Sequence, residues 1–86
     1  MKSLSDLWDS ILARLSGELS DMTIKTWFDE ITVVTMEDSA LVLHCSNPFK
    51  KNTVEARFLP HIKAALKDLF STDLEVKILD DDQLAA

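Results

Sequence analysis

With 86 residues and a formal net charge of −6, the chain has room for one domain, and its acidity disfavours strong binding to nucleic acid through phosphate contacts. Its 47% hydrophobic content and scarcity of Gly and Pro are typical of a globular fold and argue against disorder. A single cysteine, Cys45, cannot form an intramolecular disulfide, and no apolar run reaches membrane-spanning length. We therefore expect a cytoplasmic protein without a membrane partner.

Apolar residues recur at helical spacing over the first three turns. They are Leu4, Leu7, Trp8, Ile11, Leu12 and Leu15. Ser3 or Ser5 is available as the N-cap, and Gly17 is placed to end the helix in a left-handed conformation. The sequence predicts a first helix with Trp8 in its apolar stripe.

A second helix is predicted over residues 20–31, and we expect the rest of the chain to pack around it. Ile24, Trp27, Phe28 and Ile31 lie at i, i+3, i+4 and i+7 and form one apolar stripe. Ser20 or Asp21 can cap its first turn. The short link between the two helices predicts a tight helical hairpin.

Beyond residue 31 the pattern changes to the alternation of β-strands. Residues 32–36 and 40–46, joined by the polar turn 37–39, predict an antiparallel hairpin. Leu41, Leu43 and Cys45 would share its buried face, leaving Val42 and His44 on the other. Neither histidine has an acid or cysteine at ligand spacing, so no metal site is predicted.

Asn47 followed by Pro48 is a strong start signal for a third helix. Its predicted inward stripe is Phe49, Thr53, Ala56, Leu59, Ile62, Leu66 and Leu69. Pro60 interrupts this stripe and predicts a kink, or a break with a new helix. A third strand is predicted over residues 74–79.

The predicted order is α-α-β-β-α-(α)-β, an α+β domain over residues 1–79 with helices on a three-stranded sheet. Residues 80–86 have no reason to be ordered and are predicted to be an acidic tail or the start of a linker. Some KH-type modules share this order, so we expect a KH-like fold. Gly17 is the single glycine, so the G-x-x-G clamp of those modules is missing.

Catalysis requires convergent groups, and the sequence shows none. The serines and threonines are explained as caps and strand surface, and the acids are scattered over exposed helix faces. One glycine cannot build a phosphate-binding loop. We expect neither enzymatic activity nor a cofactor.

Four motifs in order resemble one family. They are L-W-x-x-x-L (Leu7, Trp8, Leu12), L-S-x-x-x-x-x-T-W-F (19–28), S-N-P-F (46–49) and R-F-L-P-x-I (57–62). Together they resemble the N-terminal domain, domain I, of the bacterial replication initiator DnaA, over about residues 3–79. The resemblance implies an interaction module that supports initiator self-association as a weak homodimer, helps to load the replicative helicase and receives regulatory proteins of initiation.

The resemblance also implies two sets of contact residues. Self-association would use Leu4 and Trp8, although Trp8 alternatively belongs to the core. Helicase or regulator binding would use Asp21, Thr23, Thr26, Trp27, Asn47 and Phe49. Trp27 is alternatively a core residue and Asn47 a helix cap. Thr23 stands where some family members carry an acid, with Asp21 nearby as its substitute.

Two other hypotheses remain open. A free-standing paralogue could act as an adaptor or decoy. A weak single-stranded DNA-binding module could use the bases of residues 47–70, where five bases face two acids, together with nearby aromatics. Those bases are Lys50, Lys51, Arg57, Lys63 and Lys67. They are alternatively a solvated helix face.

Overall fold

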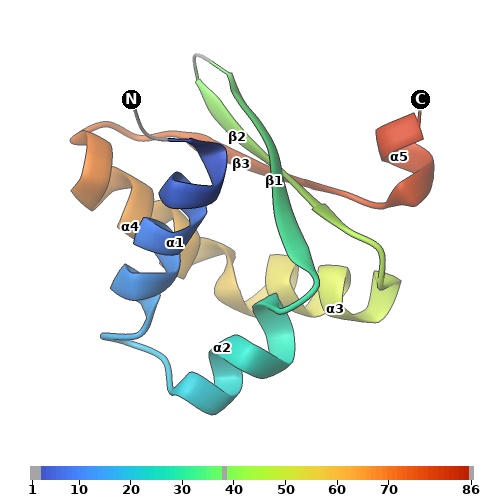
Figure 1. Cartoon of the computed structure of the whole chain (residues 1–86), viewed down its shortest axis with the longest axis horizontal. Helices are drawn as coiled ribbons and strands as arrows, with labels where there is room; N and C mark the ends of the chain where they lie inside the picture. Colours follow the sequence, from blue (N-terminus) through green and yellow to red (C-terminus); the bar gives the residue numbers. More distant parts are fainter. Residues whose placement is uncertain (1–2, 38, 86) are drawn as a thin grey trace.

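The computed structural model describes residues 3–37 and 39–85. In chain order the elements are α1 (Leu4–Leu15), α2 (Asp21–Phe28), β1 (Ile31–Glu37), β2 (Ala40–Cys45), α3 (Pro48–Thr53), the π-helical turn η1 (Val54–Phe58), α4 (Leu59–Phe70), β3 (Glu75–Leu79) and α5 (Asp81–Ala85). Figure 1 shows α1 to α4 gathered beside the sheet, with α5 apart from them beyond the end of β3. The predicted α+β class is confirmed. No helix in the described ranges is both long and apolar enough to cross a membrane.

The sheet has the order β1-β2-β3. β1 runs antiparallel to β2, with Ile31 opposite Cys45, and β3 runs parallel to β2, with Val76 opposite Leu41. A register shift between residues 33 and 35 leaves Val34 at an irregularity of edge strand β1. Asp38, in the predicted hairpin turn, lies outside the described residues.

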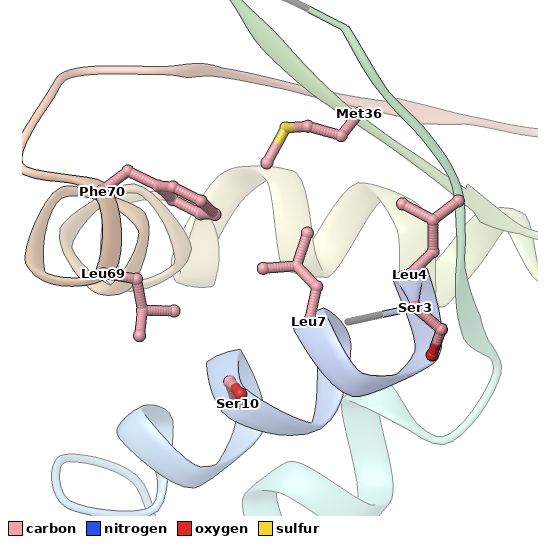
Figure 2. A pocket seen from close by; sticks show the side chains of 7 residues that line it. All are labelled: Ser3, Leu4, Leu7, Ser10, Met36, Leu69 and Phe70. Carbon is pink, nitrogen blue, oxygen red and sulfur yellow. The ribbon is translucent and has the colours of Figure 1, made fainter. Parts of the chain in front are cut away.

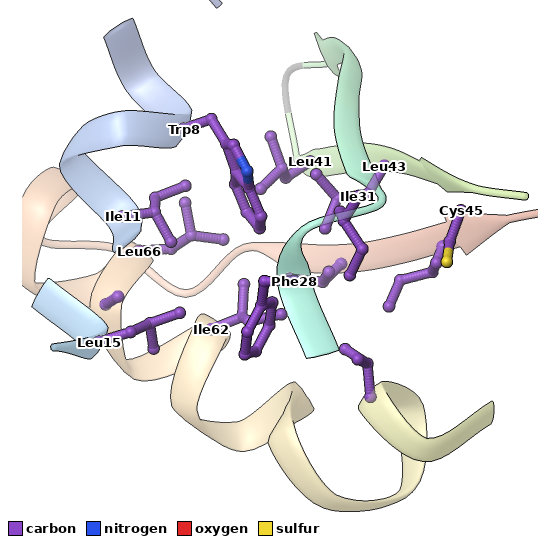
Figure 3. Packing of buried hydrophobic residues seen from close by; sticks show 14 residues of the cluster. Trp8, Ile11, Leu15, Phe28, Ile31, Leu41, Leu43, Cys45, Ile62 and Leu66 are labelled. Carbon is purple, nitrogen blue, oxygen red and sulfur yellow. The ribbon is translucent and has the colours of Figure 1, made fainter. Parts of the chain in front are cut away.

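The helices bury one face of this sheet in a single core. Figure 3 shows side chains from α1, α2 and α4 meeting those of β1 and β2. Leu41, Leu43 and Cys45 face the core, as predicted, and Val42 on the opposite face is also buried. The core consists of Trp8, Ile11, Leu15, Phe28, Ile31, Leu41, Leu43, Cys45, Val54, Ile62, Ala65, Leu66, Val76 and Ile78.

Three of the predicted N-caps are confirmed. The Ser3 hydroxyl accepts the Asp6 N–H at 3.1 Å, and the Ser20 hydroxyl accepts the Thr23 N–H at 3.1 Å. Asn47 caps α3 through its side-chain oxygen. These residues satisfy backbone donors that the first turn of each helix leaves without partners, which fixes where α1, α2 and α3 begin.

The predicted left-handed conformation of Gly17 is wrong, because no glycine has positive φ in the described chain. α1 ends at Leu15, and the Gly17 N–H donates to the Arg14 carbonyl at 3.2 Å, which continues a right-handed turn. Ser71, at the end of α4, instead takes the left-handed conformation, with φ 58°. The position of a glycine alone does not determine which helix needs a left-handed cap.

The second helix is shorter than predicted. α2 ends at Phe28, and Ile31 is the first residue of β1 rather than the last turn of the helix. Ile31 is buried against the core and pairs with Cys45. The β-branched run that begins at Ile31 favours the sheet, and this overrides the helical spacing of its side chain.

The kink or break predicted at Pro60 takes the form of the π-helical turn η1, after which α4 begins at Leu59. The predicted inward stripe is partly wrong. Val54 is buried, whereas Phe49 and Ala56 of the predicted stripe are exposed. Pro60 offers no N–H to the carbonyl four residues earlier and its ring crowds that carbonyl, so the turn widens into η1. The wider turn changes which residues face inward and points Phe58 toward α2.

The expectation that the tail is without order is wrong for residues 81–85, which form α5. Asp80 and Gln83 cap it reciprocally: the Gln83 N–H donates to Asp80 at 2.8 Å and the Asp80 N–H donates to Gln83 at 3.0 Å. The Asp81 carboxylate lies 2.6 Å from His44 Nε2 and accepts a hydrogen bond from Ser46 at 3.2 Å. The D-x-x-Q spacing was the signal for this short helix.

Candidate docking surface on α2 and α3

Phe49 stands exposed in the first turn of α3, with 66% of its surface accessible. Its backbone is fixed from two directions. Pro48 occupies the start of the helix, and the Asn47 side-chain oxygen accepts the N–H groups of Phe49 at 3.0 Å and Lys50 at 3.1 Å. A large apolar ring is therefore held in water by local geometry, which is the expected state of an interface anchor.

Trp27 on α2 supports Phe49 from the side. The two rings meet edge to face, with centroids 5.8 Å apart and an interplanar angle of 87°. Trp27 is half-buried, and its ring lies 6.5 Å from that of Phe58, which lies 5.6 Å from Phe28 in the core. A continuous chain of aromatic rings thus runs from the core to the exposed Phe49.

The remaining predicted contacts on this face lie along α2. Thr23 is half-buried, one turn before Trp27, and its hydroxyl lies 2.9 Å from that of Ser20. Asp21 and Thr26 are exposed. The structure therefore brings the Trp27 and Phe49 rings into contact, with Asn47 capping the turn that carries Phe49 and Thr23 held in the α2 cap.

Met22 is an exposed residue that the sequence interpretation missed. It is a large apolar side chain on α2 and lies mostly in solvent. Its position outside the stripe of Ile24, Trp27 and Phe28 was the available signal, since an apolar residue on the polar face of a helix gains nothing from the core.

The two residues expected to support self-association differ in solvent exposure: Trp8 is buried and Leu4 is exposed. Trp8 is 8% exposed and packs on Phe28, with ring centroids 6.3 Å apart, whereas Leu4 is 39% exposed. Leu4 lines an apolar groove of about 350 Å³ between α1, β1 and the end of α4, shown in Figure 2. Leu7, Met36, Leu69 and Phe70 supply most of its walls, with Ser3 and Ser10 at its rim.

Four of the five bases proposed for DNA contact lie near carboxylates. Lys50 contacts Asp29 and Glu30, Lys51 contacts Glu55, Lys63 contacts Glu75 and Lys67 contacts Asp73, at 2.7 to 3.8 Å. Arg57 is exposed on η1. A base already paired with a carboxylate contributes less to phosphate binding, because the pair must be broken first.

The Lys50 bridge shifts the pKa of both of its groups. The hydrogen bond from Lys50 lowers the pKa of Asp29 below its ordinary value, and the same bond raises the pKa of Lys50. Both groups are therefore charged at neutral pH. This cation lies at the C-terminal end of α2, where it also suits the helix dipole.

The two histidines each contact one carboxylate. His44 contacts Asp81, and His61 Nδ1 lies 2.8 Å from Glu18. Within residues 3–37 and 39–85, no group of three or more ligating side chains is arranged to hold a metal ion. These histidines tie α5 to the sheet and α4 to the link after α1.

Comparison with known families decides the assignment. The family model for the DnaA N-terminal domain matches residues 5–68. The chain belongs to the DnaA N-terminal domain family. The match includes α2 and α3 and therefore the α2–α3 surface, whereas Leu4, Leu69 and Phe70 of the groove beside α1 lie just outside it.

Individual relatives agree with this DnaA assignment. The chromosomal replication initiator protein DnaA of Nostoc punctiforme is 29% identical over 75 residues, which is 87% of this chain and 16% of that protein. DnaA of Trichormus variabilis is 29% identical over 76 residues, and DnaA of Gloeobacter violaceus is 28% identical over 80 residues, covering 93% of this chain and 18% of that protein. The chain thus spans about a sixth of the length of these relatives.

Proposed function

We propose that this chain is the partner-docking module of a replication initiator, and that its α2–α3 surface receives the replicative helicase or a regulatory protein of initiation. The proposal rests on the exposure of the Phe49 ring in an ordered position. The Asn47 cap holds its backbone, and the Trp27 ring packs against its side chain. Ordered aromatic side chains lose little conformational freedom on binding, so they are favoured anchors of small interfaces. Membership of the DnaA N-terminal domain family supports this reading.

The proposed module works by recognition without chemistry or a cofactor. Asp21 and Thr26 are exposed polar groups on the same helix as Trp27, and we propose that they contribute to the polar rim of the interface. Thr23 is engaged with Ser20 in the helix cap, so we propose that Asp21 carries the acidic contact of this surface.

A second surface would support weak self-association. Leu4 is exposed at the N-terminal end of α1 and lines the apolar groove between α1, β1 and the end of α4. We propose that Leu4 makes the contact between two copies, and that Trp8 acts indirectly by holding α1 on Phe28.

Two alanine variants test the docking proposal. Phe49→Ala removes the proposed anchor, whereas Phe70→Ala removes an exposed aromatic, 44% accessible, that lines the groove beside α1. We expect Phe49→Ala to weaken binding of the replicative helicase from the same organism at least about 30-fold, the effect of losing a hot spot of about 2 kcal/mol. Phe70→Ala should bind as the parent does. Equal affinity of the parent and Phe49→Ala would reject the α2–α3 surface as the helicase site.

A further inference from the structure

Lys50 joins the two helices that carry the candidate docking surface. It follows Phe49 in the first turn of α3, and its ammonium group reaches back to the end of α2, 2.8 Å from Asp29 Oδ1 and 3.4 Å from Glu30 Oε2. Only 21% of its side chain is exposed, although both acids are on the surface. One cation thus contacts two carboxylates of a different element.

We propose that Lys50 is a positioning residue of the docking surface, a role that rests on the proposed function of that surface. Its bridge to Asp29 and Glu30 sets the separation of α2, which carries Trp27, from α3, which carries Phe49. In this role Lys50 belongs to the surface's internal support and makes no contact with the partner or with nucleic acid.

The geometry supports this role because the bridge lies close in sequence to both rings. Asp29 follows Trp27 by two residues, and Lys50 follows Phe49 by one, so the ion pair and the ring pair join the same two chain segments. The Asn47 cap fixes the first turn of α3 internally, but its bonds all lie within that turn. The Lys50 bridge instead ties that turn to α2.

The adjacent lysine provides a matched comparison. Lys51 also forms a short ion pair, 2.7 Å from Glu55, but its partner lies one turn further along the same helical segment. Removing Lys51 therefore loses a local pair of similar length without releasing α3 from α2. A difference between Lys50 and Lys51 variants reports the connection between helices rather than a loss of charge.

The test uses four variants of this domain: Lys50→Gln, Lys50→Arg, Lys51→Gln and the double variant Asp29→Asn/Glu30→Gln. The partner-free readout is the nuclear Overhauser contact between the Trp27 and Phe49 rings, together with the ring-current shift of the Phe49 protons. We expect this contact to weaken in Lys50→Gln and in the double variant, and to persist in Lys50→Arg and Lys51→Gln. An unchanged ring contact in Lys50→Gln would overturn the proposal.

Helicase affinity of the same variants separates positioning from direct contact. Lys50→Gln and the double variant should each bind about fivefold more weakly, and Lys50→Arg should bind as the parent does. If only Lys50→Gln loses affinity, Lys50 touches the partner directly and the positioning role is wrong. If Phe49→Ala itself leaves helicase binding unchanged, the proposed function fails, and the ring contact still decides whether Lys50 holds the two helices in place.

Discussion

Replacing Trp8 with alanine should strongly destabilise the domain, because Trp8 is a core residue. The indole is 8% exposed and packs at a tilt of 56° on Phe28, and truncation of a buried Phe or Trp costs about 3–5 kcal/mol. At roughly 0.05–0.15 kcal/mol per residue, a domain of this size has about 4–13 kcal/mol to lose. Loss of self-association in Trp8→Ala would therefore be a consequence of lost stability.

Leu4→Ala is the control that separates the two roles. Leu4 is 39% exposed at the start of α1, so its truncation should cost about 1 kcal/mol of stability while weakening self-association directly. Urea denaturation gives the free energy of unfolding, and sedimentation equilibrium gives the dimer affinity of each variant. A Trp8→Ala domain that keeps its parent's stability but no longer dimerises would refute the core assignment.

Three further predictions concern single groups. Ser71→Gly should stabilise the domain by about 0.5–1 kcal/mol, because glycine accepts φ 58° without strain. Thermal unfolding measures this change, and a lower melting temperature would contradict the idea that Ser71 is strained. Asn47→Ala should lower the free energy of unfolding by about 1 kcal/mol, since two N–H groups of α3 lose their acceptor. The midpoint of urea unfolding, followed by fluorescence, should fall, and an unchanged midpoint would show that water replaces the cap. The hydrogen bonds from His44 and then Ser46 lower the pKa of Asp81, so docking of α5 is complete above the ordinary carboxyl range and is lost as the pH falls through the lowered pKa. Amide shifts of α5 should follow this acid transition in the parent, and a transition that persists unchanged in Asp81→Asn would assign it to another group.

Local signals predicted the elements that begin with a cap. Ser3, Ser20 and Asn47 each satisfy donors within three residues, so the sequence alone contains both partners of each bond. Pro60 predicted the interruption of the helix for the same reason, since a missing N–H and a crowded carbonyl are properties of the local chain.

Features that depend on distant partners were not predictable. Lys50 and Asp29 are 21 residues apart, and nothing in either segment indicates that they meet. The change of inward stripe at Val54 depends on how the chain widens before Pro60, and burial of Trp8 depends on where α2 places Phe28. The resemblance to a family predicted which residues form the candidate surface. The contacts that hold them, such as the Trp27–Phe58 ring contact and the Lys50–Asp29 bridge, are visible only in the folded structure.

An amide NMR titration of this domain with the replicative helicase of the same organism tests the central claim most directly. We expect localised shifts at Thr23, Thr26, Asn47 and Phe49, with Leu4 on α1 unmoved as the remote reference. Shifts confined to Leu4 and Phe70, or no shifts up to high micromolar helicase, would contradict helicase docking on the α2–α3 surface.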